Sequence, residues 1–166
     1  SQSQRLRNQV LSAWVAFVDG LIEHCESLSP AARAKFQRAY DLASTAGDAD
    51  LHALSAAWLA MADFNASDVE ATVAHIREAL RVAPADSHAA RARAALVVAS
   101  DWRVAGDDDR ANPWYKLARQ HAATEGDVSL VSVLLHNMAA FQAGRISLEG
   151  AFERADLADA QRVLLE

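Results

Sequence analysis

Two segments of this 166-residue chain repeat one another, and this internal repetition limits the folds that the chain can adopt. The segments from Tyr40 to Leu51 and from Tyr115 to Leu130 share a tyrosine, a leucine-alanine pair, a glycine-aspartate pair and a leucine in the same order. Phe64–Ala66 is matched in the same way by Phe141–Ala143. Repetition over a regular distance is the signature of stacked supersecondary units.

Composition and periodicity predict helix almost throughout the chain. Alanine is abundant, β-branched residues rarely run together, and apolar residues recur every three or four positions. Glycine, proline and capping residues divide the chain into eight expected helices. Their approximate bounds are 5–27, 30–45, 48–64, 67–83, 86–106, 112–126, 127–144 and 147–166.

Several helix starts are predicted from particular residues. Pro30 suits the first position of the second helix, and Gly47 followed by Asp48 closes that helix and opens the third. Ser67 with Glu70 three residues later reads as a capping box. Asn112–Pro113 reads as the cap and first residue of the sixth helix, after a turn formed by the aspartates at 107–109.

Equivalent helices begin about 37 to 43 residues apart, with two helices in each period. A period in this range is typical of a helical solenoid, in which each pair buries its apolar face against its neighbours. We therefore predict an all-α fold, a right-handed superhelix of about four antiparallel helix pairs, in a single domain over residues 1–166.

The part of the chain that ends at Pro84 resembles a tetratricopeptide repeat. Residues Ala79–Pro84 resemble the end of such a repeat, where a small residue precedes the proline that stops the second helix. Counting back places Leu59–Ala60 at the large-small pair of the first helix and Ile76 at the bulky core position of the second. Thr72 departs from the pattern at a small position, and the other units lack the proline. The resemblance covers residues 30–165 and implies a TPR-like α-solenoid.

The resemblance also implies a concave groove that takes a peptide, a partner helix or a small ligand. The first helix of each pair would line it. The polar candidates on the third, fifth and seventh helices are His52, Arg91, Ser132, His136 and Asn137. Each of these side chains could equally well face solvent.

The arrangement further resembles the helical N-terminal region of bacterial signalling proteins, in which such repeats precede an output domain. GGDEF-type diguanylate cyclases and MalT-like regulators are examples. The first helix, 5–27, either caps the array or pairs with its copy in a homodimer. The helix over 147–166 would lead to a further domain. Arginine greatly outnumbers lysine and alanine is in excess, which indicates a GC-rich bacterium.

The sequence contains no pattern that predicts a catalytic or metal site. The six histidines include no pair at helical ligand spacing, so we interpret them as solvated or hydrogen-bonded. Cys25, beside His24, continues an apolar stripe and is expected to be buried, like Trp14 and Trp58. Trp102 and Trp114 flank the acidic turn, and exposure of one would suit a recognition surface. We expect no enzyme activity, no metal and no cofactor.

Charge and hydropathy exclude two further classes of partner. The net charge of −6 disfavours nucleic acid, and no apolar stretch of about 18 residues could cross a membrane. A single cysteine fits a reducing compartment, so we expect a cytoplasmic protein.

These observations favour a non-catalytic interaction or sensory module that binds a protein or peptide partner. The alternative is a receptor that encloses a small ligand or signalling peptide and controls an attached output domain. A cryptic enzyme would need three titratable side chains that converge in one cleft.

Overall fold

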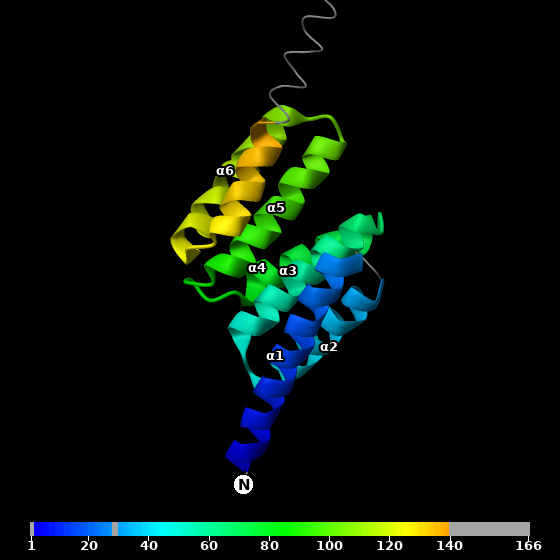
Figure 1. The fold of residues 1–166 in the computed structure, drawn as a ribbon, viewed down its shortest axis with the longest axis vertical. Coiled ribbons are helices and arrows are strands. Elements are labelled where there is room, and N and C mark those ends of the chain that lie inside the picture. The colour runs from blue at the N-terminus through cyan, green and yellow to red at the C-terminus, as the bar shows by residue number, and fades with distance from the viewer. Residues whose placement is uncertain (1, 28–29, 140–166) are drawn as a thin grey trace, which may run out of the picture. The chain divides into compact units, whose positions relative to one another are not determined.

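The computed structural model describes residues 2–27 and 30–139, which are almost entirely helical (Figure 1). The helices are α1 (Gln2–Ser27), α2 (Pro30–Ala46), α3 (Ala49–Asn65), α4 (Val69–Val82), α5 (His88–Val104) and α6 (Asp108–Glu125). Residues 128–139 are also helical, and no strand occurs within these described ranges. The prediction of an all-α fold is confirmed, while the helix expected over 147–166 lies outside the described residues.

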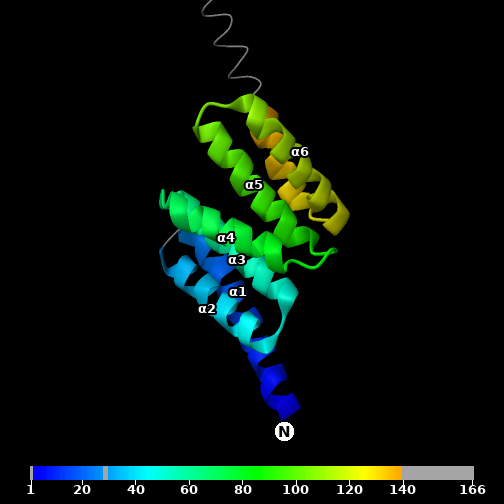
Figure 2. The same cartoon turned by 180° about the vertical axis from the view of Figure 1, so that it is seen from behind.

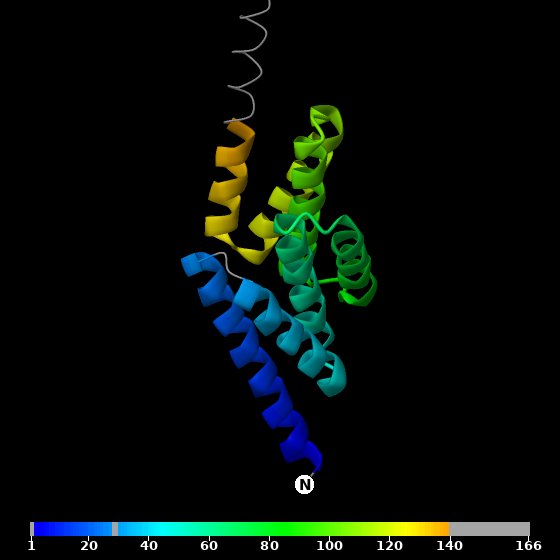
Figure 3. The same cartoon turned by 90° about the vertical axis from the view of Figure 1, so that its right-hand side faces the viewer.

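The chain divides into two compact units, Ser1–Asp127 and Val128–Glu166. In the first unit α1 packs on α2, α2 on α3, α3 on both α4 and α5, and α5 on α6. Figure 3 shows α1 and α2 running in opposite directions, and Figure 2 shows α4 lying against α3. Because α5 packs mainly on α6 and α3 and makes few contacts with α4, one face of α4 is only partly covered.

The same two-residue turn follows four of the helices, α2, α3, α5 and α6. A residue with a left-handed backbone (Gly47, Ser67, Gly106 and Gly126, with φ between 61° and 81°) precedes an aspartate in every case. Asp48, Asp68 and Asp107 then cap the next helix, each accepting a hydrogen bond of 3.0 Å from the backbone N–H three residues later. The predicted glycine-aspartate turn at 47–48 is therefore confirmed.

The predicted capping box at Ser67 is wrong. Asp68, not Ser67, is the N-cap of α4, and its side chain accepts a hydrogen bond from Ala71. Ser67 stands at the position that glycine occupies in the other three turns, with φ of 61°. Its serine side chain suggested a cap, but its backbone geometry makes it the last residue of the preceding turn.

The predicted start of the sixth helix at Asn112–Pro113 is wrong. The helix begins at Asp108 with Asp107 as its cap, and Pro113 lies inside it. An aspartate cap and acidic residues in the first turn stabilise a helix start by satisfying free N–H groups and by interacting with the helix dipole. Proline inside the helix removes one backbone hydrogen bond and crowds the carbonyl group four residues earlier, yet α6 continues through Pro113. The aspartate run thus supplies the turn and the N-terminal charges, as expected.

Small and aromatic residues fill the contact between α1 and α2. A β-carbon placed on Gly20 would lie 2.7 Å from Phe36 Cε1, so only glycine allows this approach. Phe36 is fully buried, and its ring stacks on Trp58 with centroids 5.3 Å apart and tilts against Phe17 at 5.8 Å. Trp58, predicted to be buried, packs against this core cluster but is only half-buried.

Two predictions for α1 are wrong. Cys25 is exposed, and Trp14 is 39% exposed, although both continue the apolar periodicity of the helix. The buried face of α1 is narrow and consists largely of small residues such as Ala13, Ala16 and Gly20. The helix carries more apolar residues than its contact with α2 and α3 can cover.

Candidate functional site

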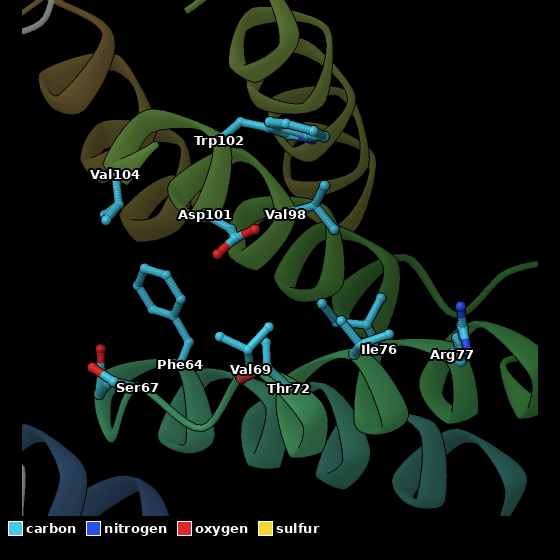
Figure 4. A pocket seen from close by; sticks show the side chains of 12 residues that line it. Phe64, Ser67, Val69, Thr72, Ile76, Arg77, Val98, Asp101, Trp102 and Val104 are labelled. Carbon is cyan, nitrogen blue, oxygen red and sulfur yellow. The ribbon is translucent and has the colours of Figure 1, made fainter. Parts of the chain in front are cut away.

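An apolar groove of about 710 Å³ lies between α4 and α5, and we call it the α4–α5 groove (Figure 4). Val69, Val73 and Ile76 on α4 are spaced four and three residues apart, so they lie on one helix face. That face is available because α5 makes few contacts with α4 and packs instead on α6 and α3. The other lining residues are Phe64, Asn65, Ser67, Thr72, Arg77, Val98, Asp101, Trp102 and Val104.

The groove carries two isolated charges. Arg77 on α4 and Asp101 on α5 are both exposed, and neither side chain forms an ion pair with another described residue. Trp102 is half-buried, and the guanidinium of Arg110 lies 4.7 Å from its ring centroid. This cation–π contact holds the indole in place beside the groove. Trp102 and Trp114 are both half-buried, and Trp102 is the one that lines the groove.

This lining is predominantly apolar, with Ser67, Thr72 and Asp101 among its polar residues. Val69 and Val104 are more than 60% exposed, and exposed apolar patches of this kind mark interaction sites. Histidine and cysteine, the usual bases and nucleophiles, are missing from the groove's described lining residues. A bound apolar group would cover the valines, and the two charges would set its orientation.

A buried carboxylate joins three helices at a second polar cluster. Asp63 on α3 has a side chain only 2% exposed, and it accepts a hydrogen bond of 2.6 Å from Arg33 Nε on α2. Its other oxygen lies 2.6 Å from Nδ1 of His75 on α4. Because an ionised carboxylate only accepts hydrogen bonds, His75 carries its proton on Nδ1. The sequence analysis did not predict this cluster. The signal was Asp63, an acidic residue within an otherwise largely apolar stretch of α3, which indicates a buried carboxylate with polar partners.

His52, a predicted groove residue, is buried on α3. Its ring lies edge-on to Tyr40 with centroids 4.4 Å apart, and its Nε2 is 3.6 Å from Glu78 Oε1. Burial lowers the pKa of His52, although the carboxylate of Glu78 acts in the opposite direction. Glu78 is held by two hydrogen bonds of 2.7 Å from Arg81, which lower the pKa of the carboxyl group. His52 is thus a packed side chain of the helix interface.

Arg91, the second predicted contact, holds the connection between α4 and α5. Its terminal nitrogen donates hydrogen bonds to the backbone carbonyls of Ala83 and Pro84, at 3.2 and 3.3 Å. These bonds fix the segment from which the two walls of the α4–α5 groove diverge. Arg91 does not line the groove itself.

The other three predicted contacts lie in the second unit. Ser132 is exposed and its hydroxyl donates to the backbone carbonyl of Val128 at 2.9 Å. His136 is exposed and Asn137 is half-buried. None of the five predicted residues lines the α4–α5 groove, and their role as partner contacts stays a prediction.

A pair of histidines joins the start of α5 to the end of α6. His88 Nδ1 and His121 Nδ1 lie 2.9 Å apart, so one ring donates and the other accepts. Burial lowers the pKa of His121, and the positive charges of His88 and Arg91 lower it further. The interpretation of hydrogen-bonded histidines is confirmed here and at His75. No set of three metal-ligating side chains occurs in residues 2–27 and 30–139.

The histidines predict how stability depends on pH. Burial lowers the pKa of His24, His52 and His121 in the folded state, so the unfolded chain binds protons first as the pH falls. The free energy of unfolding should therefore decrease between about pH 7.5 and about pH 5.5. Denaturation monitored by tryptophan fluorescence measures it. His52→Gln should make the decrease smaller than in the wild-type protein; equal slopes in the two proteins would contradict the assignment.

A comparison of the chain with protein-family models, curated proteins and solved structures found no match. None of the described helices is long and apolar enough to cross a membrane.

Proposed function

We propose that this chain is a non-catalytic binding module that holds an amphipathic helical segment of a partner protein in the α4–α5 groove. The observation that carries the proposal is the apolar stripe of Val69, Val73 and Ile76, left partly uncovered beside α5. An amphipathic helix binds such a groove through apolar residues spaced three and four positions apart. The same spacing on α4 matches this mode of binding.

The two isolated charges define the partner further. An occupant with a basic residue beside Asp101 and an acidic residue beside Arg77 would pair both groups. Such pairs select the direction of the bound helix more than they add affinity, because exposed ion pairs contribute little free energy. The expected partner segment therefore carries apolar residues on one face and opposite charges near its two ends.

The wider setting belongs to the same proposal. The packing of α1 on α2, α3 on α4 and α5 on α6 is compatible with a TPR-like right-handed superhelix of about four helix pairs. We place the module in the cytoplasm, in a regulatory protein of a bacterium. There, binding would control an attached output domain. The output domain rests on the sequence resemblance to such repeats, whereas the cytoplasm rests on the single cysteine and the bacterial source on the excess of arginine and alanine.

A second candidate function is that of a receptor for a small apolar ligand. It is favoured by the groove volume of about 710 Å³, which falls within the range of about 300–1,000 Å³ typical of small-molecule sites. A small ligand would displace a bound helix, so competition between the two distinguishes the candidates.

Matched substitutions on α4 test the groove. Val73 lines it and Leu80 does not, yet both lie on α4 and are about 40% exposed (39% and 41%). Helical peptides selected against the wild-type protein from a displayed library should bind Val73→Asp more than about tenfold more weakly, because the buried carboxylate would be unpaired. Fluorescence anisotropy measures the affinity. Leu80→Asp should stay within about twofold; equal losses in both variants would contradict the groove assignment.

A further inference from the structure

Ser67 is the one residue other than glycine with a positive φ in the described part of the chain. Its φ of 61° lies in the left-handed region, where a side chain costs free energy because its β-carbon crowds the backbone. The equivalent turns use Gly47, Gly106 and Gly126, and a β-carbon added at any of them would meet no atom within 4 Å. Glycine is thus needed in those turns for its backbone conformation, and not to make room for a neighbour. At Ser67 the fold carries a side chain despite this cost.

Ser67 also differs from the three glycines in its place on the molecule. It lines the α4–α5 groove, whereas none of the three glycines does. Figure 4 shows Ser67 at one end of the groove and Arg77 at the other. Ser67 and nearby Asn65 are both exposed lining residues, and neither side chain forms a hydrogen bond with a residue that the structure describes. The groove therefore ends in a hydroxyl and an amide that are available to a bound partner.

We propose that the Ser67 hydroxyl and the Asn65 amide donate hydrogen bonds to the free carbonyl groups at the C-terminal end of the helix bound in the α4–α5 groove. This inference rests on the proposed function and adds the direction of the bound segment. The last four carbonyl groups of a helix have no partner within the helix, so side-chain donors beside them can take the place of water. A serine in this turn supplies a donor that glycine lacks.

The two charges of the groove favour the same direction. A helix is stabilised by acidic residues near its N-terminus and by basic residues near its C-terminus. An acidic residue beside Arg77 therefore belongs to the first turn of the bound helix, and a basic residue beside Asp101 belongs to a later turn. With its N-terminus at the Arg77 end of the groove, the bound helix has its C-terminus at the Ser67 end (Figure 4).

Three substitutions test the role of Ser67, with helical peptides selected from a displayed library against the wild-type protein as the probe. Ser67→Gly should raise the folding equilibrium constant by about two- to fivefold, because it removes the crowding. It should nevertheless bind the peptides about three- to tenfold more weakly. Ser67→Ala keeps the crowding and loses the hydroxyl, so it should bind as weakly without becoming more stable. Ser67→Asn restores a donor and should bind like the wild type.

Gly47→Ser is the matched control, because it places a serine in an equivalent turn that does not line the groove. It should be less stable than the wild type and bind the peptides equally well. Denaturant titration measures the stabilities, and fluorescence anisotropy measures the affinities. A disulfide tests the direction: in a Cys25→Ser background, Ser67→Cys should cross-link to a cysteine in the last turn of the peptide and not to one in the first turn.

The contrast with Val73→Asp separates this inference from the proposed function. If Val73→Asp loses affinity while Ser67→Gly and Ser67→Ala bind like the wild type, the role of Ser67 is overturned and the groove assignment stands. If Val73→Asp binds the peptides as tightly as the wild type, the groove assignment fails and the role of Ser67 fails with it. Cross-linking to the first turn of the peptide would overturn the direction.

Discussion

Replacing Phe36 by alanine should lower the free energy of unfolding of the first unit by about 3–5 kcal/mol, the range measured for large-to-small changes at buried aromatic residues. Phe36 is fully buried and contacts rings from two other helices, those of Phe17 and Trp58. Its removal leaves a cavity beside Gly20, which has no side chain that could fill the space. The change would loosen the contact of α1 and α3 with α2 at once.

Tryptophan fluorescence can measure this loss of stability in the first unit separately from the second unit. All four tryptophans lie in Ser1–Asp127, so denaturant titration followed by fluorescence measures the first unit alone. Phe36→Leu keeps an apolar side chain of similar length and should cost less than about 2 kcal/mol. Leu117→Ala, at an exposed position of α6, serves as the surface control. A loss of less than about 1 kcal/mol in Phe36→Ala would contradict the packing described here.

Replacing Asp63 by alanine should cost about 2–3 kcal/mol, somewhat less than the loss of one partner from a fully buried ion pair. The carboxylate is buried, but Arg33 is 41% exposed and can be hydrated once its partner is gone. His75 would lose the acceptor of its Nδ1 proton in a half-buried site. The helices α2, α3 and α4 would then be joined by apolar contacts only.

A matched acidic substitution separates this effect from a change in net charge. Asp86→Asn removes an exposed carboxylate and should change the free energy of unfolding by less than about 0.5 kcal/mol. A double-mutant cycle with Arg33→Met and Asp63→Ala measures the coupling between the two side chains. The described hydrogen bonds would be contradicted if the two aspartate variants had the same stability, or if the cycle showed no coupling.

Helix type and most helix ends could be predicted from the sequence because they depend on local residues. The turn at Gly47–Asp48 combines a residue that tolerates positive φ with an aspartate cap, and both properties belong to the residues themselves. At Ser67 the type of side chain alone did not predict the helix cap correctly. Its side chain favours a cap, but the neighbouring Asp68 takes that position, and the serine is left with a backbone conformation that glycine usually adopts.

The candidate site could not be predicted, because it depends on how distant helices pack. Val69, Val73 and Ile76 form a stripe that looks the same in the sequence whether another helix covers it or not. It is left partly uncovered because α5 packs on α3, and nothing in α4 itself determines this. The polar clusters are equally long-range: Asp63 lies 30 residues from Arg33, and His88 lies 33 residues from His121.

The glycine in the middle of α1 has a consequence for how the chain folds. Glycine inside a helix lowers its intrinsic stability by about 0.5–1 kcal/mol relative to alanine, because the unfolded backbone is freer. At Gly20 this weakness coincides with the closest approach of α1 to Phe36. We therefore expect the isolated helix to be a poor nucleus for folding. Its middle turns should become ordered together with α2, so that the two helices form as one cooperative unit.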